Sequence, residues 1–277
     1  MRKVIPFLLL MVLASLGSAE QLQTDTLFDV DYLPSADYAN AKDKLDIYMP
    51  PGATESPVVV YFHGGGLMLG DKSLGQVVAK RLLAQGVGMV SANYRLSPGV
   101  THPAHIKDAA SATAWVHRNI SQYGGDPKQM YVSGHSAGAY LATLLVLDPQ
   151  HLAQHQMTLA DIRGAIPISP FLYVEETARG RPKSVWGEEP QDWRAASVTP
   201  HIAPGKPPIL LIYADGDDQW RQAQNKKLAR ELISVGNNNV KAIELPNRGH
   251  LTLISEINAD DDRIGSLIAA FVSGHSP

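Results

Sequence analysis

One stretch of the chain combines a nucleophilic side chain with the backbone freedom needed to present it. Residues 134–138 are Gly-His-Ser-Ala-Gly and lie between a short apolar run, 130–132, and a run of helix-forming residues. This pattern predicts a strand, a sharp turn and a helix, with Ser136 at the turn. The two glycines remove the side chains that would clash where strand and helix nearly touch. We therefore expect the Ser136 hydroxyl to be open to a substrate as a nucleophile.

Two groups of backbone donors are expected around this serine. The helix that follows Ser136 points its N-terminus at the site, so the Ala137 N–H faces any oxyanion formed there. Upstream, the buried strand predicted at 57–62 ends in His63, which three glycines follow at 64–66. Backbone N–H groups of this loop would supply the other half of an oxyanion hole. We expect His63 itself to order the loop by hydrogen bonding.

A serine nucleophile needs a base, and the base needs a carboxylate that holds its tautomer. After a nucleophile on such a turn, the acid is expected next along the chain, on a loop after a late strand. The apolar run 209–213 leads to Asp215, Asp217 and Asp218. We choose Asp217, which lies just before the next predicted helix; Asp215 lies closest to the strand and remains an alternative. Asp218 is expected at the N-cap of that helix.

The base is expected after the following strand. Residues 240–245 form an apolar strand pattern, and the loop that comes next carries His250. A lone histidine on a loop is usually only solvated, but this one occupies the place in the chain order that the base requires. We predict His250 as the general base.

The rest of the chain alternates strands and helices. Residues 26–32 and 44–49 alternate apolar and polar side chains, which predicts two leading antiparallel strands. Later apolar runs lack alternation, as in strands covered on both faces. Besides the strand and helix around Ser136, we expect strands at 58–62, 88–93, 164–169, 209–213 and 240–245, and helices at 73–85, 106–120, about 220–235 and 263–272. This order indicates an α/β fold with a parallel, doubly wound sheet.

One segment interrupts the alternation. Residues 174–208 are rich in proline, which predicts loop or short helices. An insertion between two sheet strands is either a lid over the site or a packing excursion. We favour a lid.

The start of the chain resembles an export signal. Residues 1–3 are basic, 4–16 are apolar apart from one proline, and 17–19 are small, which predicts a signal peptide at 1–19 and a secreted or periplasmic protein. A membrane anchor is the alternative, but the apolar run is shorter than the ~20 residues that span a bilayer. We expect residues 20–277 to form a single domain without stable membrane association.

Composition excludes several classes of partner. Of the 277 residues, 44% are hydrophobic and 18% charged, which is ordinary for a globular protein. The net charge of −3 and the lack of a basic cluster argue against nucleic-acid binding. The chain has no cysteine, so it cannot form a disulfide. We expect no metal, because the histidines lack metal-ligand spacing, and no cofactor.

These motifs together resemble the α/β-hydrolase superfamily, in particular the carboxylesterase branch with hormone-sensitive-lipase-like, acetyl-esterase and feruloyl-esterase-like enzymes. The resemblance covers nearly the whole chain after the predicted signal. Its blocks are Leu45-Asp46-Ile47-Tyr48, His63-Gly64-Gly65-Gly66, Gly70-Asp71-Lys72, Asn93-Tyr94-Arg95-Leu96, Tyr123-Gly124-Gly125-Asp126-Pro127, Gly134-His135-Ser136-Ala137-Gly138, the Asp217 loop and Gly249-His250.

The resemblance implies a role for each matching residue. Ser136 would be the nucleophile, His250 the general base and acid, and Asp217 the orienting acid. The oxyanion hole would consist of the N–H groups of Gly64, Gly65 and Ala137. Three positions depart from the family pattern, namely Leu67 where an aromatic is frequent, Ala139 in place of a glycine, and Tyr213-Ala214 in place of His-Gly.

The implied activity is hydrolysis of small soluble carboxylic esters through an acyl-enzyme. An apolar substrate pocket would be lined by Leu67, Phe171, Trp186 and Trp193. An arylformamidase or a serine peptidase of the same fold is the alternative, although peptidases usually carry a large extra domain. A non-catalytic binding protein is a further alternative that would have lost part of the Ser-His-Asp set, whereas all three residues are present.

Overall fold

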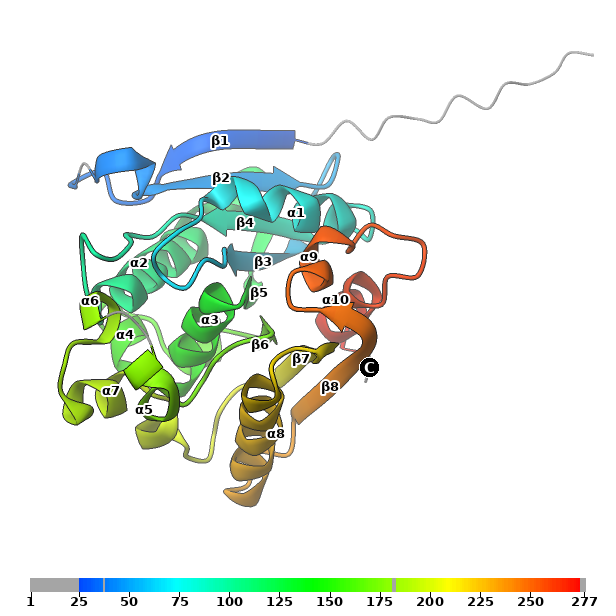
Figure 1. Cartoon of the computed structure of the whole chain (residues 1–277). Helices are drawn as coiled ribbons and strands as arrows, with labels where there is room; N and C mark the ends of the chain where they lie inside the picture. The colour runs from blue at the N-terminus through cyan, green and yellow to red at the C-terminus, as the bar shows by residue number, and fades with distance from the viewer. Residues whose placement is uncertain (1–24, 37, 181–182, 275–277) are drawn as a thin grey trace, which may run out of the picture.

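The computed structural model describes residues 25–36, 38–180 and 183–274 (Figure 1). The predicted signal peptide, 1–19, lies outside the described residues. Within the described ranges, none of the helices has the length and apolar character needed to cross a bilayer.

Eight strands form one sheet. They are β1 (Asp25–Asp31), β2 (Lys44–Met49), β3 (Ser56–Phe62), β4 (Gly88–Ala92), β5 (Gly125–His135), β6 (Gly164–Ile168), β7 (Ile209–Gly216) and β8 (Val240–Gly249). Their order across the sheet is β1-β2-β4-β3-β5-β6-β7-β8. Strand β2 is antiparallel to both β1 and β4, whereas β4, β3, β5, β6, β7 and β8 are mutually parallel. The predicted antiparallel start and the parallel sheet are confirmed.

Helices surround the sheet. They are α1 (Gln76–Leu83), α2 (Ala104–Asn119), α3 (Ala137–Leu147), α4 (Gln150–Ala153), α5 (Val174–Thr177), α6 (Lys183–Trp186), α7 (Pro190–Ala196), α8 (Gln219–Ser234), α9 (Thr252–Ser255) and α10 (Ile264–Val272). The long helices agree with the predicted ranges to within a few residues. The exception is the start of α1, where Lys72–Gly75 forms a separate 3-10 turn that begins with the Asp71 carboxylate accepting the Ser73 N–H.

The sheet has a core on each face, as the side chains of β3 show. Val58, Val60 and Phe62 pack in the cluster that includes residues of α2, α3 and α8. Val59 and Tyr61 pack in the cluster formed with α1 and α10. Successive side chains of a strand point to opposite faces, so a strand buried on both faces is apolar at every position. This explains why residues 58–62 show no alternation, and the predicted α/β-hydrolase fold class is confirmed.

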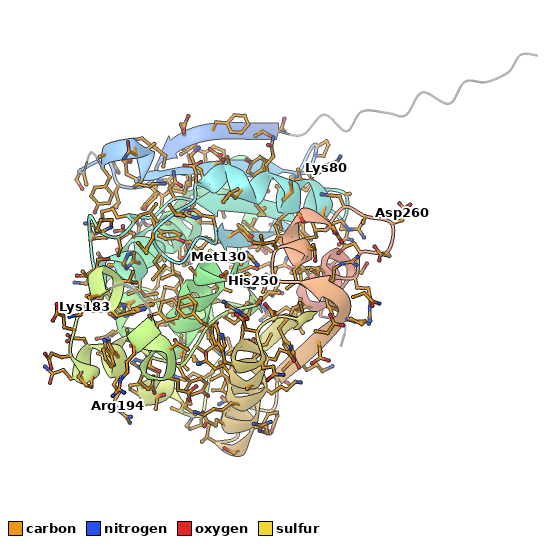
Figure 2. The ribbon with its side chains drawn as sticks, viewed as in Figure 1. Lys80, Met130, Lys183, Arg194, His250 and Asp260 are labelled. Carbon is orange, nitrogen blue, oxygen red and sulfur yellow. The ribbon has the colours of Figure 1, made fainter. Side chains whose placement is uncertain are left out.

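The segment 174–208 forms the short helices α5, α6 and α7, as its prolines predicted. Several of its side chains, including Val185 and Ala196, are buried in the same cluster as α3. The Tyr140 hydroxyl on α3 donates to the Ala196 carbonyl at 2.6 Å, so the segment is anchored on the side of α3. In Figure 2, Lys183 on α6 and Arg194 on α7 lie well to the left of His250. Movement of the segment as a lid stays a prediction.

The topology gathers several loops at one edge of the sheet. Strands β3, β5, β6, β7 and β8 are parallel neighbours. Their carboxyl ends therefore lie side by side, and so do the segments that leave them. Ligand sites of open α/β sheets are built at this edge.

Candidate active site

Ser136 lies on a sharp turn between β5 and α3. Its φ of +54° is in the left-handed region, which costs a non-glycine residue about 1–2 kcal/mol. The flanking glycines allow this turn: a Cβ on Gly138 would overlap the Phe62 carbonyl at the end of β3, and a Cβ on Gly134 would overlap the backbone of Gly138. The predicted strand, turn and helix are therefore present, with Ser136 at the apex.

His250 follows directly on β8, and its imidazole reaches Ser136. The distance from His250 Nε2 to Ser136 Oγ is 3.0 Å, although the two residues are 114 positions apart. Figure 2 shows His250 between the end of β8 and the helix α3. The backbone on either side of the imidazole is held by two contacts, from His135 Nε2 to the His250 carbonyl at 2.8 Å and from the Gly249 N–H to Thr252 Oγ1 at 2.7 Å.

Asp217, and not Asp215, contacts the histidine. Asp217 Oδ1 lies 2.7 Å from His250 Nδ1, and the Asp217 side chain is fully buried. Asp215 points to the end of β8, where its carboxylate accepts the N–H groups of Asn247 and Arg248 at 2.9 and 3.1 Å. Asp218 occupies the N-cap position of α8, but its side chain forms no capping hydrogen bond. The choice of Asp217 over Asp215 thus agrees with the contacts.

The partners of the imidazole determine its tautomer. An ionised carboxylate can only accept, so His250 Nδ1 carries the proton and Nε2 accepts from the Ser136 hydroxyl. Burial acts to raise the pKa of Asp217, but hydrogen bonds from His250, from Ser169 and from the Ala214 N–H outweigh burial and hold this pKa below its usual value. The Asp217 carboxyl group is therefore ionised at neutral pH although its side chain is buried.

Two residues that the sequence motifs did not single out contact Asp217. The Ser169 hydroxyl lies 2.5 Å from Asp217 Oδ2, and Arg221 Nε lies 3.6 Å from Asp217 Oδ1. Arg221 is one helical turn after Asp217, which is a spacing that could have identified it. Ser169 has no such signal beyond its place directly after the apolar run of β6.

The glycine-rich loop after β3 lies against Ser136. A Cβ on Gly64 would be 3.5 Å from Ser136 Cβ, and Gly65 has a φ of +120° that favours glycine. Among the described residues, the N–H groups of Gly64, Gly65 and Ala137 have no hydrogen-bond acceptor. Of the three residues, Gly64 and Ala137 lie next to Ser136, and the role of these N–H groups as an oxyanion hole stays a prediction.

His63 and Tyr94 hold the backbone of this glycine-rich loop in place. His63 Nδ1 lies 2.8 Å from the Gly64 carbonyl, and its ring stacks on Tyr94 with a centroid distance of 4.4 Å. The Tyr94 hydroxyl donates to the His63 carbonyl at 2.8 Å. Burial lowers the pKa of His63 to about 4, so the ring is neutral. The predicted ordering role of His63 agrees with these contacts.

The four residues predicted to line a substrate pocket lie largely inside the core. Leu67, Phe171 and Trp186 are at most 2% exposed and belong to the cluster around α3, against which Trp193 packs while partly buried. Phe171 stacks on Tyr140 at a centroid distance of 4.8 Å, and Trp186 meets both rings edge-on. Their contribution to substrate binding stays a prediction.

A separate cavity of about 800 Å³ lies among residues such as Arg163, Pro208 and Asn239. These residues precede β6, β7 and β8, so the cavity is at the amino ends of the strands, opposite Ser136.

Within the described ranges, no group of three or more His, Asp or Glu side chains has the arrangement of a metal site.

Comparisons with known proteins identify the family and several relatives of this chain. Residues 45–232 match the model of the BD-FAE family. Esterase LipQ of Mycobacterium tuberculosis is 29% identical over 245 residues, which are 80% of this chain and 56% of that protein. Carboxylesterase NlhH of the same species is 40% identical over 104 residues, which are 36% of this chain and 32% of that protein. The chain thus spans about half the length of LipQ.

Solved structures share the fold at low sequence identity. A truncated carbohydrate esterase from gut microbiota has a TM-score of 0.78 and 19% identity, with 93% of this chain and 98% of that chain covered. Thermogutta terrifontis esterase 2, phosphonylated by cyclosarin, has a TM-score of 0.72 and 22% identity, with 91% and 94% covered.

Proposed function

The chain belongs to the BD-FAE family, and on this premise we propose that it is a serine carboxylic-ester hydrolase acting on small soluble esters. The observation that carries the proposal is the continuous contact from Ser136 Oγ to His250 Nε2 at 3.0 Å, and from His250 Nδ1 to Asp217 Oδ1 at 2.7 Å. Acyl transfer by a serine requires a base within hydrogen-bond distance of the hydroxyl and a carboxylate that orients this base.

In the first step, Ser136 is acylated. His250 Nε2 takes the hydroxyl proton while Oγ bonds to the ester carbonyl carbon, and the carbonyl oxygen becomes an oxyanion. The N–H groups of Gly64, Gly65 and Ala137 stabilise that charge. Asp217 stabilises the imidazolium. The bond to the alcohol oxygen then breaks, and His250 returns the proton to the departing alcohol.

In the second step, water replaces the alcohol. His250 Nε2 takes one proton from the water, whose oxygen bonds to the acyl carbon. The bond from that carbon to Ser136 Oγ breaks, and the proton returns to Oγ as the carboxylic acid leaves. The same three backbone donors act on both oxyanions, and loss of one such donor costs about 10²–10³ in turnover.

Relatives support small esters as the substrate class. Thermogutta terrifontis esterase 2 has been solved with propionate and with butyrate bound. Residues 20–277 should therefore be assayed on p-nitrophenyl esters from acetyl upward, with Ser136→Ala as the control. We expect the highest kcat/KM on short chains and a loss of at least about 10³-fold in the variant.

Other outcomes identify the alternatives. Equal rates for wild type and Ser136→Ala would contradict a serine mechanism. Faster cleavage of an N-formyl arylamide would favour an arylformamidase, and faster cleavage of a peptide amide would favour a peptidase. An inert wild type on all three would favour a binding protein.

A covalent probe tests the nucleophile independently of the ester. The phosphonylated state of the Thermogutta esterase motivates treatment of this protein with a fluorophosphonate. We expect one adduct on the peptide that contains Ser136 and none in Ser136→Ala. An adduct on another serine would exclude Ser136 as the nucleophile.

We further propose that residues 1–19 direct export, so that the enzyme acts in the periplasm or outside the cell without stable membrane association. The support is the basic, apolar and small-residue order of this segment. N-terminal sequencing of the exported protein should begin at Glu20. Retention of Met1 in a membrane fraction would instead indicate the anchor.

A further inference from the structure

Ser169 lies beside the three residues of the proposed mechanism, at the end of β6. Its side chain is fully buried. The hydroxyl oxygen is 2.5 Å from Asp217 Oδ2 and 3.0 Å from His250 Nδ1. It therefore touches both the carboxylate and the ring nitrogen whose hydrogen bond determines the tautomer of the base.

The backbone of Ser169 is held in a conformation that a serine rarely adopts. Its φ is +54°, the same value as for Ser136. The next residue is Pro170, which further restricts the residue before it to extended conformations with negative φ. Residues with rare backbone dihedral angles persist where surrounding contacts hold them in place, and they are frequent at functional sites.

Two contacts hold that backbone. The Ser169 N–H donates to the Ile212 carbonyl on β7 at 2.7 Å, and its carbonyl accepts from Arg221 Nη1 at 2.9 Å. Arg221 comes from α8, one turn after Asp217, and its side chain is 9% exposed. The same strand and helix thus orient both Asp217 and Ser169, so the hydroxyl is directed at the carboxylate.

A hydroxyl has one proton and two lone pairs. The Ser169 proton goes to Asp217 Oδ2, which is 2.5 Å away and can only accept. The lone pairs remain free to accept the proton on His250 Nδ1 at 3.0 Å. The Nδ1–H group therefore has two acceptors, Asp217 Oδ1 at 2.7 Å and Ser169 Oγ.

We propose that Ser169 is a positioning residue of this site, and that its hydroxyl is a second acceptor for the His250 Nδ1–H. The proposal rests on the proposed ester hydrolysis for its kinetic consequences. When His250 gains the Ser136 proton, both of its nitrogens carry protons. Ser169 and Asp217 then share the one on Nδ1, and no proton passes to Ser169.

A double-mutant cycle tests the proposal. The kcat and KM for p-nitrophenyl acetate are measured for wild type, Ser169→Ala, Asp217→Ala and the double variant. In the presence of Asp217 we expect Ser169→Ala to lower kcat about tenfold with little change in KM. In Asp217→Ala the hydroxyl is the remaining acceptor, so its removal should cost about a hundredfold. If Ser169→Ala lowered kcat by the same factor or a smaller one in the Asp217→Ala background than in the wild type, the proposal would be overturned. Ser169 would then act only through the carboxylate.

Ser169→Gly separates this role from a structural one. Glycine tolerates a positive φ, so Ser169→Gly should unfold at a higher temperature than Ser169→Ala and yet lose kcat to the same extent. Wild-type kcat in Ser169→Gly would show that only the backbone conformation matters.

Proton NMR provides a readout that needs no substrate. The Nδ1–H of His250 should give a downfield resonance that is absent from His250→Gln. We expect this resonance to persist in Asp217→Ala and to disappear in the double variant. If the resonance were lost in Asp217→Ala, the role of Ser169 as a second acceptor would be overturned. If the spectra were as expected but the wild type hydrolysed no ester, only the proposed function would be overturned.

Discussion

Asp217 Oδ1 and His250 Nδ1 lie 2.7 Å apart and join the loop after β7 to the loop after β8. Asp215, two residues earlier at the end of β7, instead accepts the N–H groups of Asn247 and Arg248 near the end of β8. One aspartate thus contacts the ring of the proposed base, and the other holds the end of the strand that directly precedes this base.

The two aspartates should therefore differ in their effect on catalysis. We expect Asp217→Asn to lower kcat by about 10⁴, because an amide can stabilise the wrong tautomer of His250. Asp215→Asn is the matched control and should lower kcat by no more than about tenfold. Ester assays of both variants decide the matter, and a larger loss in Asp215→Asn would reverse the assignment.

Glycine at position 138 is required for the turn at Ser136. A Cβ there would overlap the Phe62 carbonyl, and rigid backbone cannot move aside. We expect Gly138→Ala to lose at least about 3 kcal/mol of unfolding free energy, a fall of roughly 10 °C in the unfolding midpoint. Gly180→Ala, where a Cβ meets nothing within 4 Å, is the control and should leave the midpoint unchanged. Equal unfolding midpoints for Gly138→Ala and Gly180→Ala would contradict the close approach of Gly138 to the Phe62 carbonyl.

Buried neutral histidines should make the fold sensitive to acid. Burial lowers the pKa of His135 to about 3 and of His63 to about 4, against about 6.5 in an unfolded chain. Between these values the unfolded state binds more protons, so stability falls as the pH decreases below about 6.5. Each such histidine contributes a slope of about 1.4 kcal/mol per pH unit in this window.

Denaturant unfolding at pH 7 and pH 4.5 measures this slope. Burial also lowers the pKa of His102 to about 3 and of His105 to about 4, so the slopes of several histidines add. His63→Gln should be less stable than wild type at pH 7 but should lose less stability on acidification. If the wild type and His63→Gln lost the same unfolding free energy on acidification, His63 would take up its proton in the folded state.

Trp186 tests whether the aromatic residues beside α3 act as core or as pocket. Its side chain is 2% exposed and packs on Tyr140 and Phe171. Truncation of a buried tryptophan costs about 3–5 kcal/mol, so Trp186→Ala should greatly lower the unfolding free energy. Trp193→Ala, at a partly buried position, should cost less. A raised KM without loss of stability would instead support the predicted pocket.

The sequence by itself determined the class of fold and three members of the site. Continuous apolar runs such as 58–62 identify strands buried on both faces, and the glycines around Ser136 identify the turn. Both signals are local, because the period of a strand and the space required at a turn depend on neighbouring residues. The order of Ser136, an acid and His250 then follows from the order of the strands.

Only the tertiary structure decided which side chains meet. Asp215 lies at the end of β7 and Asp217 directly after this strand, and their different partners depend on how β7 and β8 align. Ser169 has no motif, and its hydroxyl reaches Asp217 because β6 and β7 are neighbours in the sheet. The packing of the 174–208 segment on α3 buries the Trp186 side chain, and the expected part of Trp186 in substrate binding stays a prediction. Contacts between residues 48 to 114 positions apart depend on strand order and packing, which no local pattern encodes.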